Sequence, residues 1–212
     1  MEREAVFSEL EKSVVGELMN ISIGNAVTSL GILLNNLIHV TTPNVELLGR
    51  GDMIWHDDKE TVITRVDFVS GVCGYTVMFL GEEQARILTD LMMGGDGYGE
   101  YYQKEISDIH FSAISEAMNQ ITGAVATSLA GLLDVRVNIS VPVTEKEDTG
   151  NYMEQHFPGE ERFVKISFRL QLGEATETEI AILYPYSMAG KIIEYLIDKH
   201  VPDRIGNGAD EE

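Results

Sequence analysis

Two stretches of this chain place the same four residue types at the same spacing, 99 positions apart. The first set is Ser13, Glu17, Asn20 and Pro43, and the second is Ser112, Glu116, Asn119 and Pro142. At 100° per residue in an α-helix, the Ser, Glu and Asn of each set lie in one narrow stripe, which Gly24 or Gly123 continues. A Glu and an Asn on an exposed helix are usually solvated surface, but two copies in one register, with diverged residues between them, indicate a function.

The two side-chain types define what chemistry the stripe can do. An asparagine carboxamide is neither a nucleophile nor a general base at neutral pH, but it offers a hydrogen-bond donor and an acceptor and so can hold a water molecule. A glutamate one turn away can form an ion pair with a lysine or arginine of a partner. The pattern therefore predicts a site whose reactive centre lies on another protein, with the amide orienting the attacking water.

The stripes belong to two long helical patterns, at about residues 7–36 and 105–133. In the first pattern, apolar residues recur at spacings of three and four, as on one buried helix face (Met19, Ile23, Ala26, Leu30 and Leu33). That face lies about 130° around the helix from the stripe. We therefore expect the stripe to point to solvent when the apolar face packs on a sheet.

Each half continues with three strand-like runs and a short closing helix. The strands are expected at 37–48, 60–69 and 74–80, and again at 135–144, 162–172 and 178–184, with closing helices at about 82–93 and 186–199. Their alternating residues are typical of half-buried antiparallel strands. The predicted fold class is α+β, with two pseudo-symmetric α-β-β-β-α halves whose long helices pack on one shared six-stranded antiparallel sheet.

The duplication predicts a single domain over residues 1–199. The repeats themselves span about 8–93 and 105–198. Residues 94–99, rich in glycine, form a turn-rich connection between them, and they lack the Lys-Ser/Thr of a phosphate loop. Residues 200–212 are expected to form an acidic tail or the start of a linker.

Composition argues against several classes of function. The 212 residues include 15 Lys and Arg against 35 Asp and Glu, a formal charge of −20 that disfavours nucleic-acid binding and electrostatic docking on membranes. The single cysteine, Cys73, excludes an internal disulfide framework, and we expect its thiol to be buried and inert. The five histidines lack metal-ligand spacing, so we expect no metal or cofactor on this chain. A charged start and the lack of an 18-residue apolar stretch favour a cytoplasmic protein.

The motif Ser-x3-Glu-x2-Asn-x22-Pro, complete in both copies, resembles that of the CheC/CheX/FliY phosphatases of bacterial chemotaxis, and the resemblance covers residues 8–198. Free-standing CheC proteins have about this length. The residues around the motifs, at 20–25, 41–43 and 117–120, are more similar to the CheC-like domain of FliY proteins of the flagellar motor switch. Both assignments stay open at this point.

The resemblance implies an activity and a role for each motif residue. Members of the family dephosphorylate the phosphorylated response regulator CheY. Asn20 and Asn119 would orient water for attack on its aspartyl phosphate, and Glu17 and Glu116 would pair with its active-site lysine. Mg²⁺ would belong to CheY rather than to this chain. The four remaining motif residues would support the site without acting on the phosphate (Ser13, Ser112, Pro43 and Pro142).

The partners implied by the resemblance depend on the branch of the family. A FliY-type protein would bind the flagellar switch proteins FliM, FliG and a FliN-like domain at the cytoplasmic face of the basal body, whereas a CheC-type protein would bind CheD. The alternative from another functional class is a catalytically idle structural module of the switch ring. The presence of both Glu-x-x-Asn pairs favours catalysis over that alternative.

Overall fold

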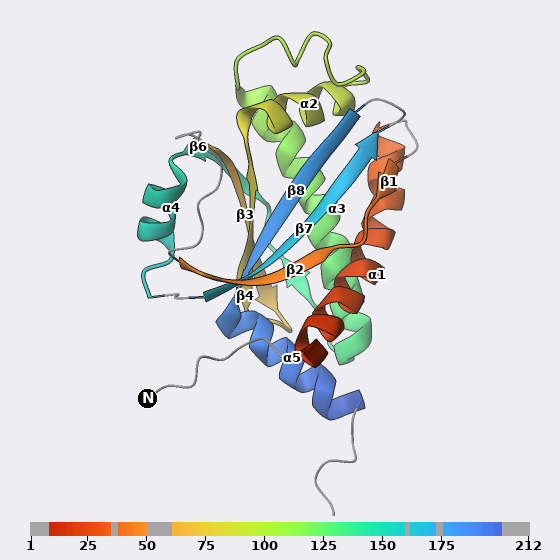
Figure 1. Ribbon diagram of the computed structural model, residues 1–212, viewed down its shortest axis with the longest axis vertical. Helices are drawn as coiled ribbons and strands as arrows, with labels where there is room; N and C mark the ends of the chain where they lie inside the picture. Colours follow the sequence, from red (N-terminus) through yellow and green to blue (C-terminus); the bar gives the residue numbers. More distant parts are fainter. Residues whose placement is uncertain (1–8, 35–37, 51–60, 160–161, 173–175, 201–212) are drawn as a thin grey trace, which may run out of the picture.

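The computed structural model describes residues 9–34, 38–50, 61–159, 162–172 and 176–200 (Figure 1). The elements follow the order predicted from the sequence, with one additional helix. They are α1 (Glu9–Leu34), β1 (Ile38–Val40), β2 (Asn44–Gly49), β3 (Thr61–Ser70), β4 (Gly74–Leu80), α2 (Glu82–Met92), α3 (Asp108–Leu133), β5 (Asn138–Ile139), β6 (Val143–Glu147), α4 (Thr149–His156), β7 (Arg162–Leu172), β8 (Thr176–Pro185) and α5 (Tyr186–His200). The predicted tail, residues 200–212, lies outside the described residues apart from His200, which ends α5.

The strands form one antiparallel sheet in the order β1-β7-β8-β4-β3-β5, with β2 also pairing with β7 and β6 also pairing with β3. The sheet therefore has six positions, as predicted, but each edge position is divided into two strands. Pro43 and Pro142 stand directly before β2 and β6, where these divisions end. A proline lacks the N–H that a strand donates, so edge strands and their interruptions tolerate it. The predicted α+β class is confirmed.

The two halves of the sequence exchange their edge strands. Strand β2 of the first half pairs with β7 of the second, and β6 of the second half pairs with β3 of the first. At the centre, β4 pairs with β8 and places Met78 opposite Ile182. These two residues are 104 positions apart, and the same offset relates Ala85 and Leu88 of α2 to Ala189 and Ile192 of α5. The pseudo-two-fold axis therefore passes between Met78 and Ile182. Each half therefore depends on the other to complete its part of the sheet.

Helices α1 and α3 pack side by side on one face of the sheet, while α2 and α5 lie at its opposite ends (Figure 1). The buried side of α1 is formed by Val15, Leu18, Ser22 and Ala26. Of the apolar face predicted for this helix, only Ala26 has a described side chain, and it is buried; the side chains of the other four lie outside the described residues. A fully buried Leu or Ile contributes about 1.5–3 kcal/mol, so this layer fixes both helices against the sheet.

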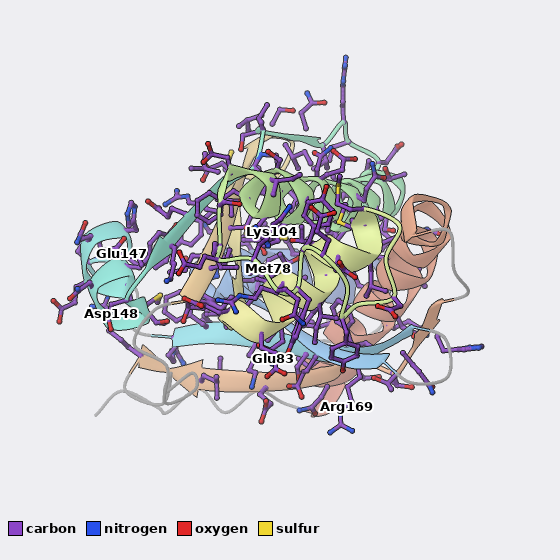
Figure 2. All side chains as sticks on the ribbon, turned by 90° about the horizontal axis from the view of Figure 1, so that it is seen from above. Met78, Glu83, Lys104, Glu147, Asp148 and Arg169 are labelled. Atoms are coloured by element: carbon purple, nitrogen blue, oxygen red, sulfur yellow. The ribbon has the colours of Figure 1, made fainter. Side chains whose placement is uncertain are left out.

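The opposite face of the sheet is partly covered by α4, which was not predicted. The Asp148 side chain accepts a hydrogen bond from the Asn151 N–H at 2.9 Å and so caps this helix. The Phe157 ring stacks on Tyr75, with 4.6 Å between ring centroids. The Arg50 guanidinium donates to the carbonyls of Met153 and Phe157 and holds the end of the helix. Figure 2 shows Glu147 and Asp148 at this side of the molecule, and Arg169 on the sheet face that points away from α3.

The environment predicted for Cys73 was wrong, because this side chain is exposed. Cys73 lies in the short turn between β3 and β4 rather than inside a strand. Gly71 makes that turn possible with a φ of 77°, and a Cβ at this position would lie 2.3 Å from the carbonyl oxygen of Arg136.

None of the described helices is long and apolar enough to cross a membrane.

Candidate functional site

The first copy of the motif forms an open polar stripe on α1. Ser13, Glu17, Asn20 and Gly24 are all exposed. They lie on the side of the helix away from its buried residues, as the helical spacing predicts. Glu17 and Asn20 are one turn apart on the same face, so their side chains can contact one partner group together.

The second copy repeats this arrangement on α3, but it is less open. Ser112 is exposed, and its hydroxyl donates to the Asp108 carbonyl at 2.8 Å. Glu116 and Asn119 are half-buried. The Glu116 carboxylate also accepts a hydrogen bond from the side chain of Gln120, at 2.7 Å from Nε2 to Oε1. The expectation that the stripe faces solvent therefore holds fully for α1 and only in part for α3.

The fold keeps the two sites apart. The first site lies in the lower part of α1, near α5, whereas the second lies in the part of α3 nearest to α2, because the helices run in opposite directions (Figure 1). Ser13 and Glu17 accordingly share a surface groove with Leu132 at the far end of α3. The pseudo-two-fold arrangement thus gives two separate sites rather than one composite site.

The second site is positioned by hydroxyl groups that the sequence analysis did not identify. Ser115 precedes Glu116, and its hydroxyl lies 2.6 Å from that of Thr144 in β6, which lies 2.9 Å from the hydroxyl of Thr64 in β3. Pro142, two residues before Thr144, marks the break in the edge strand. At the equivalent positions the first half has Gly16 and Val45, which carry no hydroxyl. This polar link is therefore specific to the second site.

The start of α3 is fixed by a buried carboxylate, Asp90, with 1% of its surface exposed. It accepts hydrogen bonds from the N–H groups of Gly97, Gly99 and Tyr101 at 2.9–3.0 Å. Burial raises the pKa of Asp90, but these backbone donors lower it more, and the net shift is below the ordinary value of 3.8. The predicted turn-rich connection is confirmed, and it is folded around this side chain.

Histidine His110 joins that connection to the helix. Its Nε2 lies 3.0 Å from the carbonyl oxygen of Tyr101, and its Nδ1 lies 3.0 Å from the hydroxyl of Ser107, the N-cap of α3. The imidazole is completely buried. Asp90 and His110 thus determine where α3 begins, at Asp108, four residues before Ser112 of the motif.

One group of potential metal ligands lies outside both sites. Glu145 and Glu147 of β6 and His156 of α4 bring one ligand atom each within 4.8 Å of one another. The sequence spacing did not reveal it because the ligands come from two elements. His156 is exposed and stacks on Tyr152, and clusters of exposed acidic groups commonly exist without an ion. No motif residue belongs to this group.

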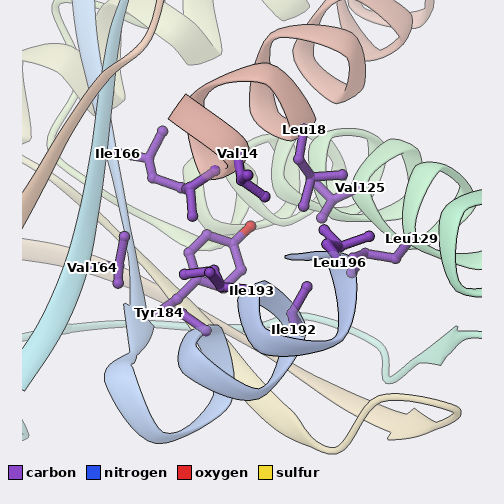
Figure 3. A pocket seen from close by; sticks show the side chains of 12 residues that line it. Val14, Leu18, Val125, Leu129, Val164, Ile166, Tyr184, Ile192, Ile193 and Leu196 are labelled. Atoms are coloured by element: carbon purple, nitrogen blue, oxygen red, sulfur yellow. The ribbon is translucent and has the colours of Figure 1, made fainter. Parts of the chain in front are cut away.

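An apolar cavity of about 30 Å³ lies between α1, α3, α5 and the sheet (Figure 3). The Tyr184 ring lies among its lining residues. Its buried hydroxyl makes no hydrogen bond of good geometry to the described residues, although the Thr76 side chain is close enough to lower its pKa slightly against the effect of burial. Burial raises the pKa of this phenol to about 12. Val14, Leu18 and Leu196 line both this cavity and the surface groove beside Ser13 and Glu17.

Comparisons with known proteins agree with this fold and these motifs. A model of the CheC-like family matches residues 10–47 and 109–145, the segments that hold both copies of the motif. The crystal structure of Thermotoga maritima FliY matches with a TM-score of 0.79 at 30% identity, over 92% of this chain and 100% of that one. The FliM middle domain from H. pylori shares the fold alone, with a TM-score of 0.71 at 12% identity, over 89% of this chain and 99% of that one.

The fold and the duplicated motif define a CheC-like protein, and the chain belongs to this family. It is 35% identical over 197 residues to the flagellar motor switch phosphatase FliY of Bacillus subtilis (strain 168). The match covers 90% of this chain and 50% of that protein, so the chain spans about half the length of this relative. The resemblance inferred from the motif is confirmed.

Proposed function

We propose that this domain accelerates hydrolysis of the aspartyl phosphate of phosphorylated CheY at the flagellar motor switch. The observation that carries the proposal is the Glu-x-x-Asn pair on each of two long helices, with Glu17 and Asn20 exposed on the surface of α1. The name of the B. subtilis relative, a flagellar motor switch phosphatase, supports the same reaction.

In the proposed mechanism, the asparagine of one site enters the active site of CheY. Its carboxamide holds a water molecule in line with the phosphorus atom. The water oxygen forms a bond to phosphorus as the bond from phosphorus to the aspartate oxygen breaks, which yields inorganic phosphate and a free carboxylate. Glu17 or Glu116 pairs with the lysine of CheY and fixes the relative position of the two proteins. The Mg²⁺ ion belongs to CheY.

The supporting residues of the motif have structural roles in this proposal. Ser112 hydrogen-bonds within the first turn of α3, and Ser13 occupies the same position in α1. Pro43 and Pro142 interrupt the edge strands that lie against the long helices. None of these four residues is expected to contact the phosphoryl group.

The proposal places the protein on the cytoplasmic face of the flagellar basal body, next to FliM, FliG and a FliN-like domain. The similarity to FliY proteins of T. maritima and B. subtilis supports a FliY-type protein over a free-standing CheC protein that binds CheD. The experiment must distinguish this phosphatase from a structural module of the switch ring that has no catalytic activity.

The test is phosphate release from phosphorylated CheY with Mg²⁺, with and without this protein. We expect faster release with the wild-type chain, loss of the acceleration in the double variant Asn20→Ala/Asn119→Ala, and an intermediate rate in each single variant. Asn44→Ala, at an exposed position in β2, is the matched control and should keep the wild-type rate. A folded wild-type chain that gives no acceleration would contradict the proposal and favour the structural role.

A further inference from the structure

The two copies of the motif are not equivalent at the residue that follows each asparagine. Ile21 follows Asn20, and 46% of its surface is exposed. At the equivalent position of α3, Gln120 donates its amide hydrogen bond to Oε1 of Glu116. The same position of the repeat therefore carries an exposed apolar side chain beside the first site and, at the second site, an amide that hydrogen-bonds to the motif glutamate.

A surface groove of about 310 Å³ starts at the first site. Glu17 lies on its wall, together with apolar side chains from three helices, among them Ile21 of α1, Leu132 of α3 and Leu196 of α5. Exposed apolar surface that adjoins polar groups is typical of protein-binding sites. Because Glu17 belongs both to the motif and to the groove, the groove directly adjoins the first site.

We propose that residues 21 and 120 determine the relative strengths of the two sites, and that the site of Glu17 and Asn20 binds the phosphorylated regulator more tightly. Ile21 and the groove receive an apolar side chain of the regulator next to its phosphorylation site. Gln120 occupies an oxygen of Glu116 with which the regulator's lysine must pair. The inference rests on the proposed function, and it makes both residues specificity-determining rather than catalytic.

The half-burial of the second site supports the same ranking. Glu116 and Asn119 are partly covered, so a partner reaches them over a smaller surface than Glu17 and Asn20. Ser115 is also held by Thr144, which restricts any adjustment of α3 toward a partner. The first site has Gly16 at that position and has no such link.

Each site is tested alone, with the other inactivated. The Asn119→Ala background leaves the first site, and there Ile21→Gln should raise the KM for phosphorylated CheY about five-fold, as expected when contact with roughly half of an Ile side chain is lost. The Asn20→Ala background leaves the second site, and there Gln120→Ile should lower KM about three-fold. The kcat of both should stay within about two-fold, because neither residue holds the water.

Two controls separate this effect from a change in folding. Ile21→Leu keeps the apolar surface and should retain the KM of its background. Val69→Gln makes the same kind of change at a position that is 59% exposed and lies on the sheet face away from α1 and α3, and it should change neither parameter. Dissociation constants for CheY activated with beryllofluoride, a phosphoryl mimic, should shift in the same directions as KM.

The binding measurement also distinguishes this inference from the proposed function. If the wild-type chain binds activated CheY without releasing phosphate, the proposed activity fails while the ranking of the sites is still measured. Equal dissociation constants for the two single-site backgrounds, or exchanges at 21 and 120 that leave binding unchanged, overturn the inference. Absence of binding at both sites overturns it as well.

Discussion

Replacement of Asp90 by alanine should destabilise the fold by about 3 kcal/mol, because this carboxylate organises the connection between the two halves. It is almost completely buried and accepts hydrogen bonds from three backbone N–H groups at 2.9–3.0 Å. A hydrogen bond to a charged group contributes about 1.5–3 kcal/mol, so the three give a gross contribution of roughly 4.5–9 kcal/mol. Water can reach part of the connection after the substitution, which reduces the expected loss to about 3 kcal/mol.

The measurement is urea or thermal unfolding of the wild-type chain, Asp90→Ala and a matched control. For a chain of this size, a loss of 3 kcal/mol lowers Tm by about 6–12 °C. The control is Asp96→Ala, which removes an exposed carboxylate that accepts a hydrogen bond from the Tyr98 N–H in the same connection. Its expected cost is below about 1 kcal/mol. If Asp90→Ala unfolds within 1 kcal/mol of wild type, the connection does not depend on this side chain.

Asp90 also predicts a pH dependence of known sign. Its folded pKa lies below 3.8, so the unfolded chain binds the proton more readily. The charged form therefore stabilises the fold fully above about pH 3.8, and this stabilisation is lost as the pH falls through the folded pKa. We expect the stability difference between wild type and Asp90→Asn to be constant from pH 7 to pH 5 and to shrink below pH 4. A difference that grows on acidification would contradict the assigned direction of the shift.

Urea unfolding tests three further substitutions, for which we expect different effects on the free energy of unfolding. Gly95→Ala would place a Cβ 2.1 Å from the Asp90 Oδ2, so it should cost about 2 kcal/mol or more, and an unchanged midpoint would refute this packing. Gly16→Ala adds a methyl group to open space inside α1 and should stabilise by about 0.5–1 kcal/mol. Tyr184→Phe removes a buried hydroxyl without a hydrogen bond and should be neutral or stabilising by up to about 1 kcal/mol; a loss above that would reveal a partner for the hydroxyl.

The long helices and the order of the strands were predictable because their signals are periodic and occur twice. Apolar residues at spacings of three and four from Met19 to Leu33 predicted a helix, and the structure extends that helix over Glu9–Leu34. The second copy confirmed the boundaries of the first. Pro43 and Pro142 cannot donate a strand hydrogen bond, and each stands where an edge strand is divided. The sequence did not predict the division itself, because a proline is tolerated equally well at the start of an undivided edge strand.

The contacts that adjust the sites were not predictable, because they join elements far apart in the sequence. Thr144 reaches Ser115 only after β6 has paired with β3, and nothing in the local sequence indicates that pairing. Helix α4 is eight residues long and includes Gly150, so its periodic signal is weak. The bond between Gln120 and Glu116 is an exception. Its spacing of four residues on one helix face is readable from the sequence.

The exchange of edge strands explains how one fold can hold two copies of a site that diverge separately. Because β2 and β6 each cross to the other half, both long helices rest on a sheet to which both halves contribute, and loss of either half would remove part of the sheet under both helices. The separation of three residues on an α-helix gives Glu and Asn the same spacing in α1 and α3. Positions outside that spacing are free to differ, and residues 16, 21 and 45 differ from 115, 120 and 144. In α3 and β6 these positions carry the hydroxyls and the amide that contact Ser115 and Glu116, so the two copies share the Glu and Asn pair but differ in the residues that surround it.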